Sequence, residues 1–180
     1  GAICMNFMDL ANTRQSDRTF TTQKVERAEL LKCLQAAQAA PSARNLQPWK
    51  FIILDDPELV QQAAAIIAEN KLGINKFAQT VPVLVAVIEE PNSATPDTPN
   101  KWAQFDLGSA TTHFCLQAAE LGLGTCIMGA FPEEQMKDFL HVPQNRRILV
   151  MLAVGYPAGE TRAKTRKELN AIHCFNQYEA

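Results

Sequence analysis

Three side chains near the N-terminus are spaced in a way that could bind a phosphate group. Arg14, Ser16 and Arg18 lie two residues apart in the polar stretch 12–22. In an extended segment every second side chain points to the same side, so two guanidinium groups and a hydroxyl would converge. Arginine binds phosphate oxygens through paired hydrogen bonds, which suits this arrangement. The alternative is an N-terminal segment whose charged side chains are simply solvated.

A second alternating pair of cations stands near the other end of the sequence. Lys164 and Arg166 lie in the basic stretch 162–167. If the fold brings the two basic segments together, both could contact one phosphate group. The sequence alone leaves open whether they meet.

A polar loop between two prolines is the other candidate binding element. Residues before a proline avoid the helical conformation, so Ala40 and Gln47, which precede Pro41 and Pro48, should mark the ends of regular structure. A short polar loop held between two rigid elements could bind a polar planar ligand. The alternative is an ordinary helix-to-strand turn. The polar side chains in the loop are those of Ser42, Arg44, Asn45 and Gln47.

The sequence carries no motif of a known catalytic nucleophile, and no G-x-S-x-G, P-loop or H-E-x-x-H occurs. Its three histidines and five cysteines lack metal-ligand spacing, so we expect no metal site. The odd cysteine count without a C-x-x-C indicates free thiols in a reducing compartment. Because no side chain stands out as catalytic, a cofactor should carry the chemistry. The cations and the amide-rich loop point to a phosphorylated flavin or a similar ligand.

Length and composition are typical of one globular domain spanning residues 1–180. The chain is 47% hydrophobic and 20% charged, with a net charge of −2. This charge gives no indication of a nucleic-acid or membrane partner. No stretch reaches the roughly 20 apolar residues of a membrane span, and the apolar piece 2–10 lacks the basic start of a signal peptide. We therefore expect a cytoplasmic protein, with Gly1 as a remnant of cloning.

Hydrophobic spacing predicts a mixture of helices and strands around this candidate site. The stretch 82–88 is nearly all apolar, so we expect a central strand covered on both faces. Enough helices are present to cover both faces of a sheet, which implies a three-layer α/β or α+β domain. The predicted helices span 5–10, 24–40, 56–70, 102–121 and 132–140, the predicted strands span 49–54, 82–88, 125–128 and 147–154, and 89–100 is a long proline-rich loop.

Two apolar segments could belong to an interface. The helix predicted over 102–121 is apolar nearly all round, so it must be buried on several sides. It could do so in a dimer interface or as the central helix of a monomeric core. Gly122 is expected to cap this helix. The tail 168–180 has apolar residues at three-residue steps and could pack on its own core or on a partner subunit.

Four motifs occur in a fixed order between Asn12 and Lys167. They are Arg14-x-Ser16-x-Arg18-x-Phe20, then Pro41-Ser42-x-x-Asn45-x-Gln47-Pro48-Trp49, then Asp106-x-Gly108 followed by Ala119-x-x-Gly122-Leu123-Gly124, and finally Gly155-Tyr156-Pro157 with Lys164-x-Arg166. In this order and spacing the chain resembles the nitroreductase family of FMN-dependent oxidoreductases. The resemblance implies an α+β three-layer sandwich with a mostly antiparallel central sheet flanked by helices, built as an intertwined homodimer.

The resemblance also implies that FMN lies at the dimer interface and which residues contact it. The N-terminal and C-terminal cations would hold the phosphate, one loop would reach the flavin of the opposite subunit, and one strand end would lie along the ring. The residues that match these roles are Arg14, Ser16 and Arg18, then Lys164 and Arg166, then Pro41, Ser42, Ala43 and Asn45, and finally Ile127, Met128 and Gly129. The segment 71–76 could add a further contact.

The implied activity is hydride transfer from NADH or NADPH to an electron-poor acceptor such as a nitroaromatic or a quinone. The kinetics would be ping-pong, with both substrates using the flavin in turn. The flavin would carry the chemistry, so no catalytic side chain is expected. The alternative function is a non-catalytic flavin- or nucleotide-binding module for storage or sensing.

Overall fold

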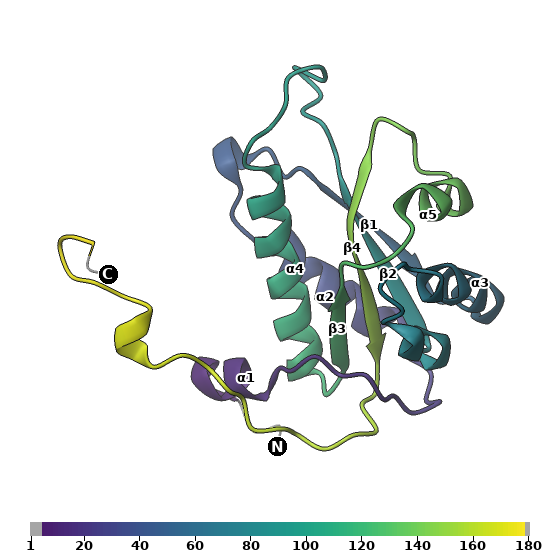
Figure 1. The fold of residues 1–180 in the computed structure, drawn as a ribbon, viewed down its shortest axis with the longest axis horizontal. Coiled ribbons are helices and arrows are strands. Elements are labelled where there is room, and N and C mark those ends of the chain that lie inside the picture. Colours follow the sequence, from purple (N-terminus) through teal and green to yellow (C-terminus); the bar gives the residue numbers. More distant parts are fainter. Residues whose placement is uncertain (1–4, 179–180) are drawn as a thin grey trace.

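The computed structural model describes residues 5–178, and its centre is a four-stranded antiparallel sheet (Figure 1). Gly1, Cys4 and the last two residues of the tail lie outside the described part. The strands are β1 (Trp49–Leu54), β2 (Val83–Glu89), β3 (Gly124–Met128) and β4 (Arg147–Gly155), in the order β1-β2-β4-β3. All three pairings are antiparallel. The four predicted strands are confirmed, as is the antiparallel sheet.

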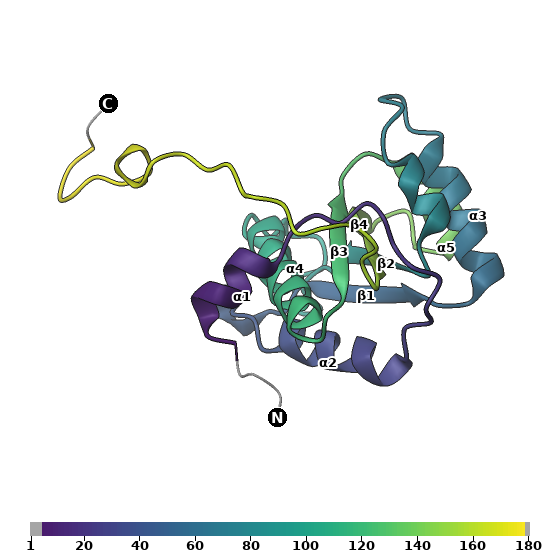
Figure 2. The same ribbon diagram turned by 90° about the horizontal axis from the view of Figure 1, so that it is seen from below.

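Helices cover both faces of the sheet and produce three layers (Figure 2). Both faces of the sheet need to be covered because strand β2 lies between β1 and β4, and all but its last residue are buried. Its alternate residues therefore pack in opposite directions. Val85 faces a cluster formed with α2 and α4, whereas Leu84 faces a cluster formed with α3 and α5. The helices are α2 (Arg27–Gln38), α3 (Pro57–Ala68), α4 (Ala103–Glu120) and α5 (Glu133–Leu140).

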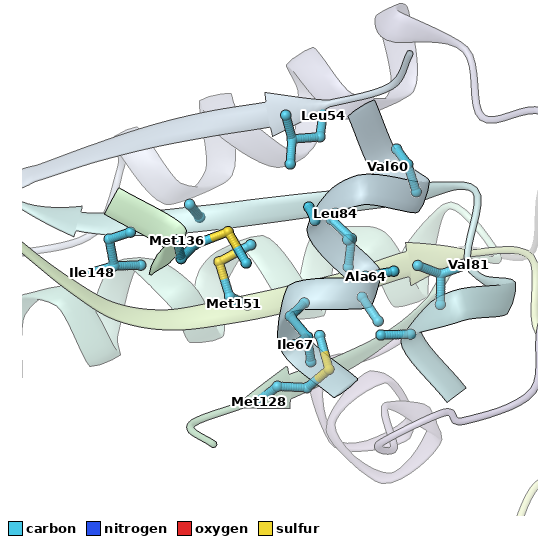
Figure 3. Packing of buried hydrophobic residues seen from close by; sticks show 14 of the residues in the cluster. Leu54, Val60, Ala64, Ile67, Val81, Leu84, Met128, Met136, Ile148 and Met151 are labelled. Atoms are coloured by element: carbon cyan, nitrogen blue, oxygen red, sulfur yellow. The ribbon is translucent and has the colours of Figure 1, made fainter. Parts of the chain in front are cut away.

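The α3 side of the sheet has a core rich in methionine (Figure 3). Ile67 of α3, Met136 of α5 and Met151 of β4 are all fully buried there. Met128, the last residue of β3, turns its side chain into the same cluster. Methionine is unbranched and fills irregular gaps, so it suits the junction between two helices and the sheet.

Helix α4 buries one side only. Leu107 and Phe114 are fully buried against the sheet, whereas Phe105 is 72% exposed. A single chain therefore leaves one large aromatic side chain of this helix exposed, and the choice between a dimer interface and a monomeric core stays open. The expected cap is confirmed, because Gly122 has φ +77° and the Leu123 amide donates to the Ala118 carbonyl at 2.8 Å.

The two ends of the chain differ from the sequence expectation. The first helix, α1, spans Phe7–Thr13 rather than 5–10, because the Asn6 side chain caps it by accepting the Asp9 amide at 3.0 Å. The described part of the tail 168–180 extends away from the body (Figures 1 and 2). Its apolar residues stay exposed, so packing on its own core is ruled out for the described tail. These residues are Leu169, Ile172, Phe175 and Tyr178. Within residues 5–178, no helix combines the length and apolarity that a bilayer span requires.

Candidate functional site

The N-terminal segment carrying the alternating cations lies along β3. Ser16 forms an isolated parallel bridge with Thr125, and the Asp17 amide donates to the Thr125 carbonyl at 2.9 Å. The close approach depends on Gly124, since a Cβ there would lie 2.6 Å from Asp17 Oδ2. The backbone of this segment is therefore fixed against the sheet, which leaves its other side chains available for a ligand.

Gln15 joins the N-terminal segment to the chain that follows β4. Its amide nitrogen donates to the Glu160 carbonyl at 3.1 Å, and its amide oxygen accepts the Arg162 amide at 2.9 Å. Lys164 Nζ also donates to the Ala11 carbonyl at 2.6 Å. Both segments pass below β3 in Figure 1, and in Figure 2 they run close together beside it. Sequence reasoning missed this role of Gln15, because a single amide in a polar stretch gives no local signal.

Arg14, Lys164 and Arg166 form a basic cluster where these segments meet. Desolvation lowers the pKa of Lys164 below its ordinary value, and the positive charges of Arg14 and Arg166 lower it further. Within residues 5–178, none of the three has a carboxylate within ion-pair distance. Such a cluster of uncompensated cations would be stabilised by an anion, so the structure brings together the two basic segments noted in the sequence.

Two further arginines, one from each segment, meet at the Ser16 carbonyl. Arg18 Nη1 donates to the Ser16 carbonyl at 3.4 Å, and the guanidinium of Arg162 donates to the same oxygen. Burial raises the pKa of the nearby Cys126 thiol, while both arginines oppose this shift. Sequence reasoning did not count Arg162 among the site residues, although it extends the alternation of Lys164 and Arg166 by one step.

The end of β3 presents a mixed surface. Ile127 is 47% exposed, and a Cβ added to Gly129 would meet no heavy atom within 4 Å. The side chain of Met128 is buried, so this residue can offer a ligand only its backbone. Asn75, in the left-handed conformation, donates through Nδ2 to the Ala130 carbonyl at 3.0 Å. This bond places the segment 71–76 next to the strand end.

The proline-bounded loop is strained and held from two sides. Three residues that are not glycine have positive φ, namely Arg44 at 52°, Asn45 at 55° and Gln47 at 49°. Such conformations persist only where neighbours enforce them, and they concentrate at ligand sites. Here Ser42 Oγ accepts the Gln47 amide at 3.0 Å. Asp106 Oδ2 accepts the Ala43 amide at 3.1 Å from the first turn of α4.

Asp106 is a second residue whose role sequence reasoning missed. It belongs to one of the four motifs, but the motif gives no indication that it anchors a loop 63 positions earlier. The carboxylate is only 2% exposed. The positive end of the helix dipole also stabilises an aspartate in the first turn. Asp106 thus fixes the loop to the N-terminal end of α4.

The two groups of candidate residues lie at opposite ends of α4 (Figure 1). The loop is attached near Asp106, whereas Arg14 lines a small cavity with Ala119 and Gly122 at the other end. At 1.5 Å per residue, Asp106 and Ala119 are about 20 Å apart along the helix. Within one chain, the loop and the basic cluster therefore do not form one site.

Two relatives and one solved structure resemble this chain over most of its length. A protein of Archaeoglobus fulgidus, named as a candidate NADH dehydrogenase/NAD(P)H nitroreductase, is 30% identical over 152 residues, covering 82% of this chain and 83% of the relative. Iodotyrosine deiodinase of Thermotoga neapolitana is 28% identical over 169 residues, covering 83% and 87%. The solved structure of an FMN-dependent nitroreductase from Clostridium difficile R20291 gives a TM-score of 0.80 at 25% identity, covering 94% of this chain and 98% of that one.

A family model described as "Nitroreductase family" matches residues 11–156, which is well over half of the chain. The matched region begins just before the N-terminal cations and ends directly after β4. It includes the strained loop, α4 and the exposed end of β3. Together with the four-stranded antiparallel sheet and its two helical layers, this match establishes that the chain belongs to the nitroreductase family.

Proposed function

We propose that this protein binds FMN and transfers hydride from NADH or NADPH to an electron-poor acceptor such as a nitroaromatic or a quinone. The observation that carries the proposal is the basic cluster of Arg14, Lys164 and Arg166, which lacks a carboxylate partner among the described residues. The names of an FMN-dependent nitroreductase and an FMN-containing oxidoreductase among the structural relatives support the choice of ligand.

The residues at the site fit the two chemically different ends of FMN. The phosphate would be held by the basic cluster, with Ser16 adding a hydroxyl, since arginine and lysine both favour phosphate oxygens. The ring system is planar and largely apolar, which suits the exposed Ile127 and the uncrowded backbone at Gly129. No side chain at Gly129 prevents a ligand from approaching the chain closely.

Bound FMN would supply the chemistry of hydride transfer between the nicotinamide and the acceptor. The residues of this chain bind, orient and adjust charge. Arg18 is our candidate for the cation that would offset negative charge on the ring, because a fixed positive charge stabilises negative charge that develops during a reaction. A protonating side chain is unnecessary, since water can supply the proton.

A complete site would require two copies of the chain in a homodimer. The proposed ring contacts of Pro41, Ser42, Ala43 and Asn45 lie at the far end of α4 from the basic cluster, about 20 Å away at the helical rise of 1.5 Å per residue. Two chains packed with their α4 helices antiparallel would bring the loop of one subunit to the cluster of the other. The 72% exposed Phe105 and the apolar tail are consistent with such an interface.

A stopped-flow experiment separates the enzyme from a flavin-storage or sensing module. The purified protein is saturated with FMN, made anaerobic and mixed with NADH or NADPH while flavin absorbance is followed. We expect at least one nucleotide to bleach the bound flavin, and a nitroaromatic or quinone added next to restore its colour. Flavin that is bound but never bleached would contradict the oxidoreductase and favour the storage or sensing module.

A further inference from the structure

A second cavity lies against the strained loop, on the side of Arg44. Its volume is about 310 Å³, within the usual range of small-molecule sites. The cavity opens between this loop and the proline-rich chain that precedes α4. The residues that line it are Arg44, Leu46, Asn92, Thr95, Thr98, Pro99, Asn100, Lys101 and Trp102.

The charged groups in this lining are all positive. Arg44 and Lys101 contribute two cations, and no aspartate or glutamate lines the cavity. Within the described chain, neither cation has a carboxylate within 4.0 Å. Lys101 Nζ instead lies 5.0 Å from the ring centroid of Trp102, which is 49% exposed. The wall therefore combines positive charge with an accessible aromatic face.

Asn100 adds an unused hydrogen-bond donor to the same wall. Its side-chain oxygen accepts the Trp102 amide at 3.1 Å, and its carbonyl accepts the Ala103 amide at 3.0 Å. Its Nδ2 is buried and has no hydrogen-bond partner. A buried donor without an acceptor is unfavourable, so a ligand that supplies oxygen atoms would be stabilised there.

The backbone that presents Arg44 is the strained part of the loop. Arg44 has φ 52° and ψ 24°, in the left-handed region that an arginine rarely adopts. The hydrogen bond from the Ala43 amide to Asp106 fixes the neighbouring residue. The fold thus maintains an unfavourable backbone conformation that directs Arg44 to the cavity, which points to ligand binding.

We propose that this cavity binds the carboxylate of an aromatic acid that serves as the electron acceptor. Arg44, Lys101 and the Asn100 amide would donate to the carboxylate oxygens, and the face of Trp102 would contact the aromatic ring. The proposal rests on the proposed function, because the same loop carries Ser42 and Asn45, the residues expected at the flavin. An acceptor anchored by its carboxylate on one side of the loop would lie beside the flavin.

Benzoate tests the binding site without any redox reaction. The FMN-loaded protein is titrated with benzoate and with neutral benzyl alcohol by calorimetry. We expect benzoate to bind more tightly than benzyl alcohol, and Arg44→Gln or Lys101→Gln each to raise the benzoate Kd at least fivefold. Lys24→Gln, which changes an exposed lysine outside the cavity, should leave the benzoate Kd within twofold. Equal binding of benzyl alcohol, or unchanged benzoate binding in both cavity variants, would overturn the site.

Kinetics with matched acceptors then test the link to turnover. Arg44→Gln should raise the KM for 4-nitrobenzoate at least fivefold relative to the KM for 4-nitrobenzyl alcohol. An unchanged ratio would show that the acceptor is not anchored here. Inorganic phosphate binding more tightly than benzoate would assign the cavity to phosphate instead. Because benzoate binding needs no electron transfer, a protein that binds benzoate but oxidises neither nucleotide would refute the proposed function alone.

Discussion

Replacing Gly129 with alanine should lower the affinity for FMN without lowering the stability of the fold. A Cβ at this position meets no heavy atom within 4 Å, and its φ lies outside the left-handed region. The free energy of unfolding of the FMN-free protein should therefore stay the same or rise by up to about 1 kcal/mol, because alanine lowers the entropy of the unfolded chain. Only a ligand lying against the backbone would meet the added methyl group.

The expected loss of FMN affinity follows from the overlap of the methyl group with the ring. Adding a methyl group to a tightly packed contact costs about 1–3 kcal/mol. That range corresponds to a Kd about 5- to 150-fold higher, at about 1.4 kcal/mol for each factor of ten. The Kd is measured by quenching of flavin fluorescence, and stability by urea unfolding of the FMN-free protein.

Gly124→Ala is the matched comparison, since a Cβ there would lie 2.6 Å from Asp17 Oδ2. This variant should lose about 1–3 kcal/mol of stability because the added methyl group overpacks a filled site. If Gly129→Ala binds FMN as tightly as the unchanged protein, the ring does not lie against this strand end. The assignment of Ile127 and Gly129 to the ring would then be wrong.

Three further predictions concern the phosphate cluster and the loop. Arg166→Ala should raise the Kd for FMN at least tenfold, whereas Lys167→Ala should leave it within twofold; equal effects would mean that only overall charge matters. The pKa of Lys164 is lowered, and a bound phosphate would raise that pKa. FMN binding should therefore weaken as the pH rises through the pKa that Lys164 has in the FMN-free protein, by up to about tenfold per pH unit. Lys164→Arg should abolish this alkaline dependence, because arginine stays charged; a dependence that persists would exclude Lys164. Asp106→Ala should weaken FMN binding about tenfold or more, since hydrogen bonds to charged groups contribute about 1.5–3 kcal/mol. The cap variant Asp56→Ala should cost about 1 kcal/mol of stability with unchanged FMN affinity.

The sequence predicted those parts of the fold that local patterns determine. The nearly continuous apolar run of β2 indicated a central strand buried on both faces, and Pro41 and Pro48 marked the limits of the loop. Gly122 was correctly expected to cap α4, because its place at the end of an apolar run is a local signal. These features need only neighbouring residues, so one sequence is enough to predict them.

Long-range contacts were not predictable from local patterns. Gln15 reaches Glu160 across 145 positions, and Asp106 reaches Ala43 across 63. Nothing at either end of these pairs distinguishes them from other polar residues. The resemblance to the family placed Arg14 and Lys164 in one site before any geometry was available. The separation of the loop from this cluster along α4 became evident only from the fold.

The central claim is that each FMN is held by two chains, and subunit complementation tests it directly. One chain carries Arg14→Ala and Arg166→Ala, and the other carries Ser42→Ala and Asn45→Gly, where glycine retains the positive φ. In a mixed dimer of the two, one site would combine an intact cluster with an intact loop, and the other would have neither.

The measurement is the amount of FMN per dimer after the mixed dimer is purified through two different tags. The account predicts one FMN per mixed dimer and almost none in either parent homodimer. A mixed dimer without FMN, or FMN retained by an isolated monomer, would contradict a site shared between two copies of the chain.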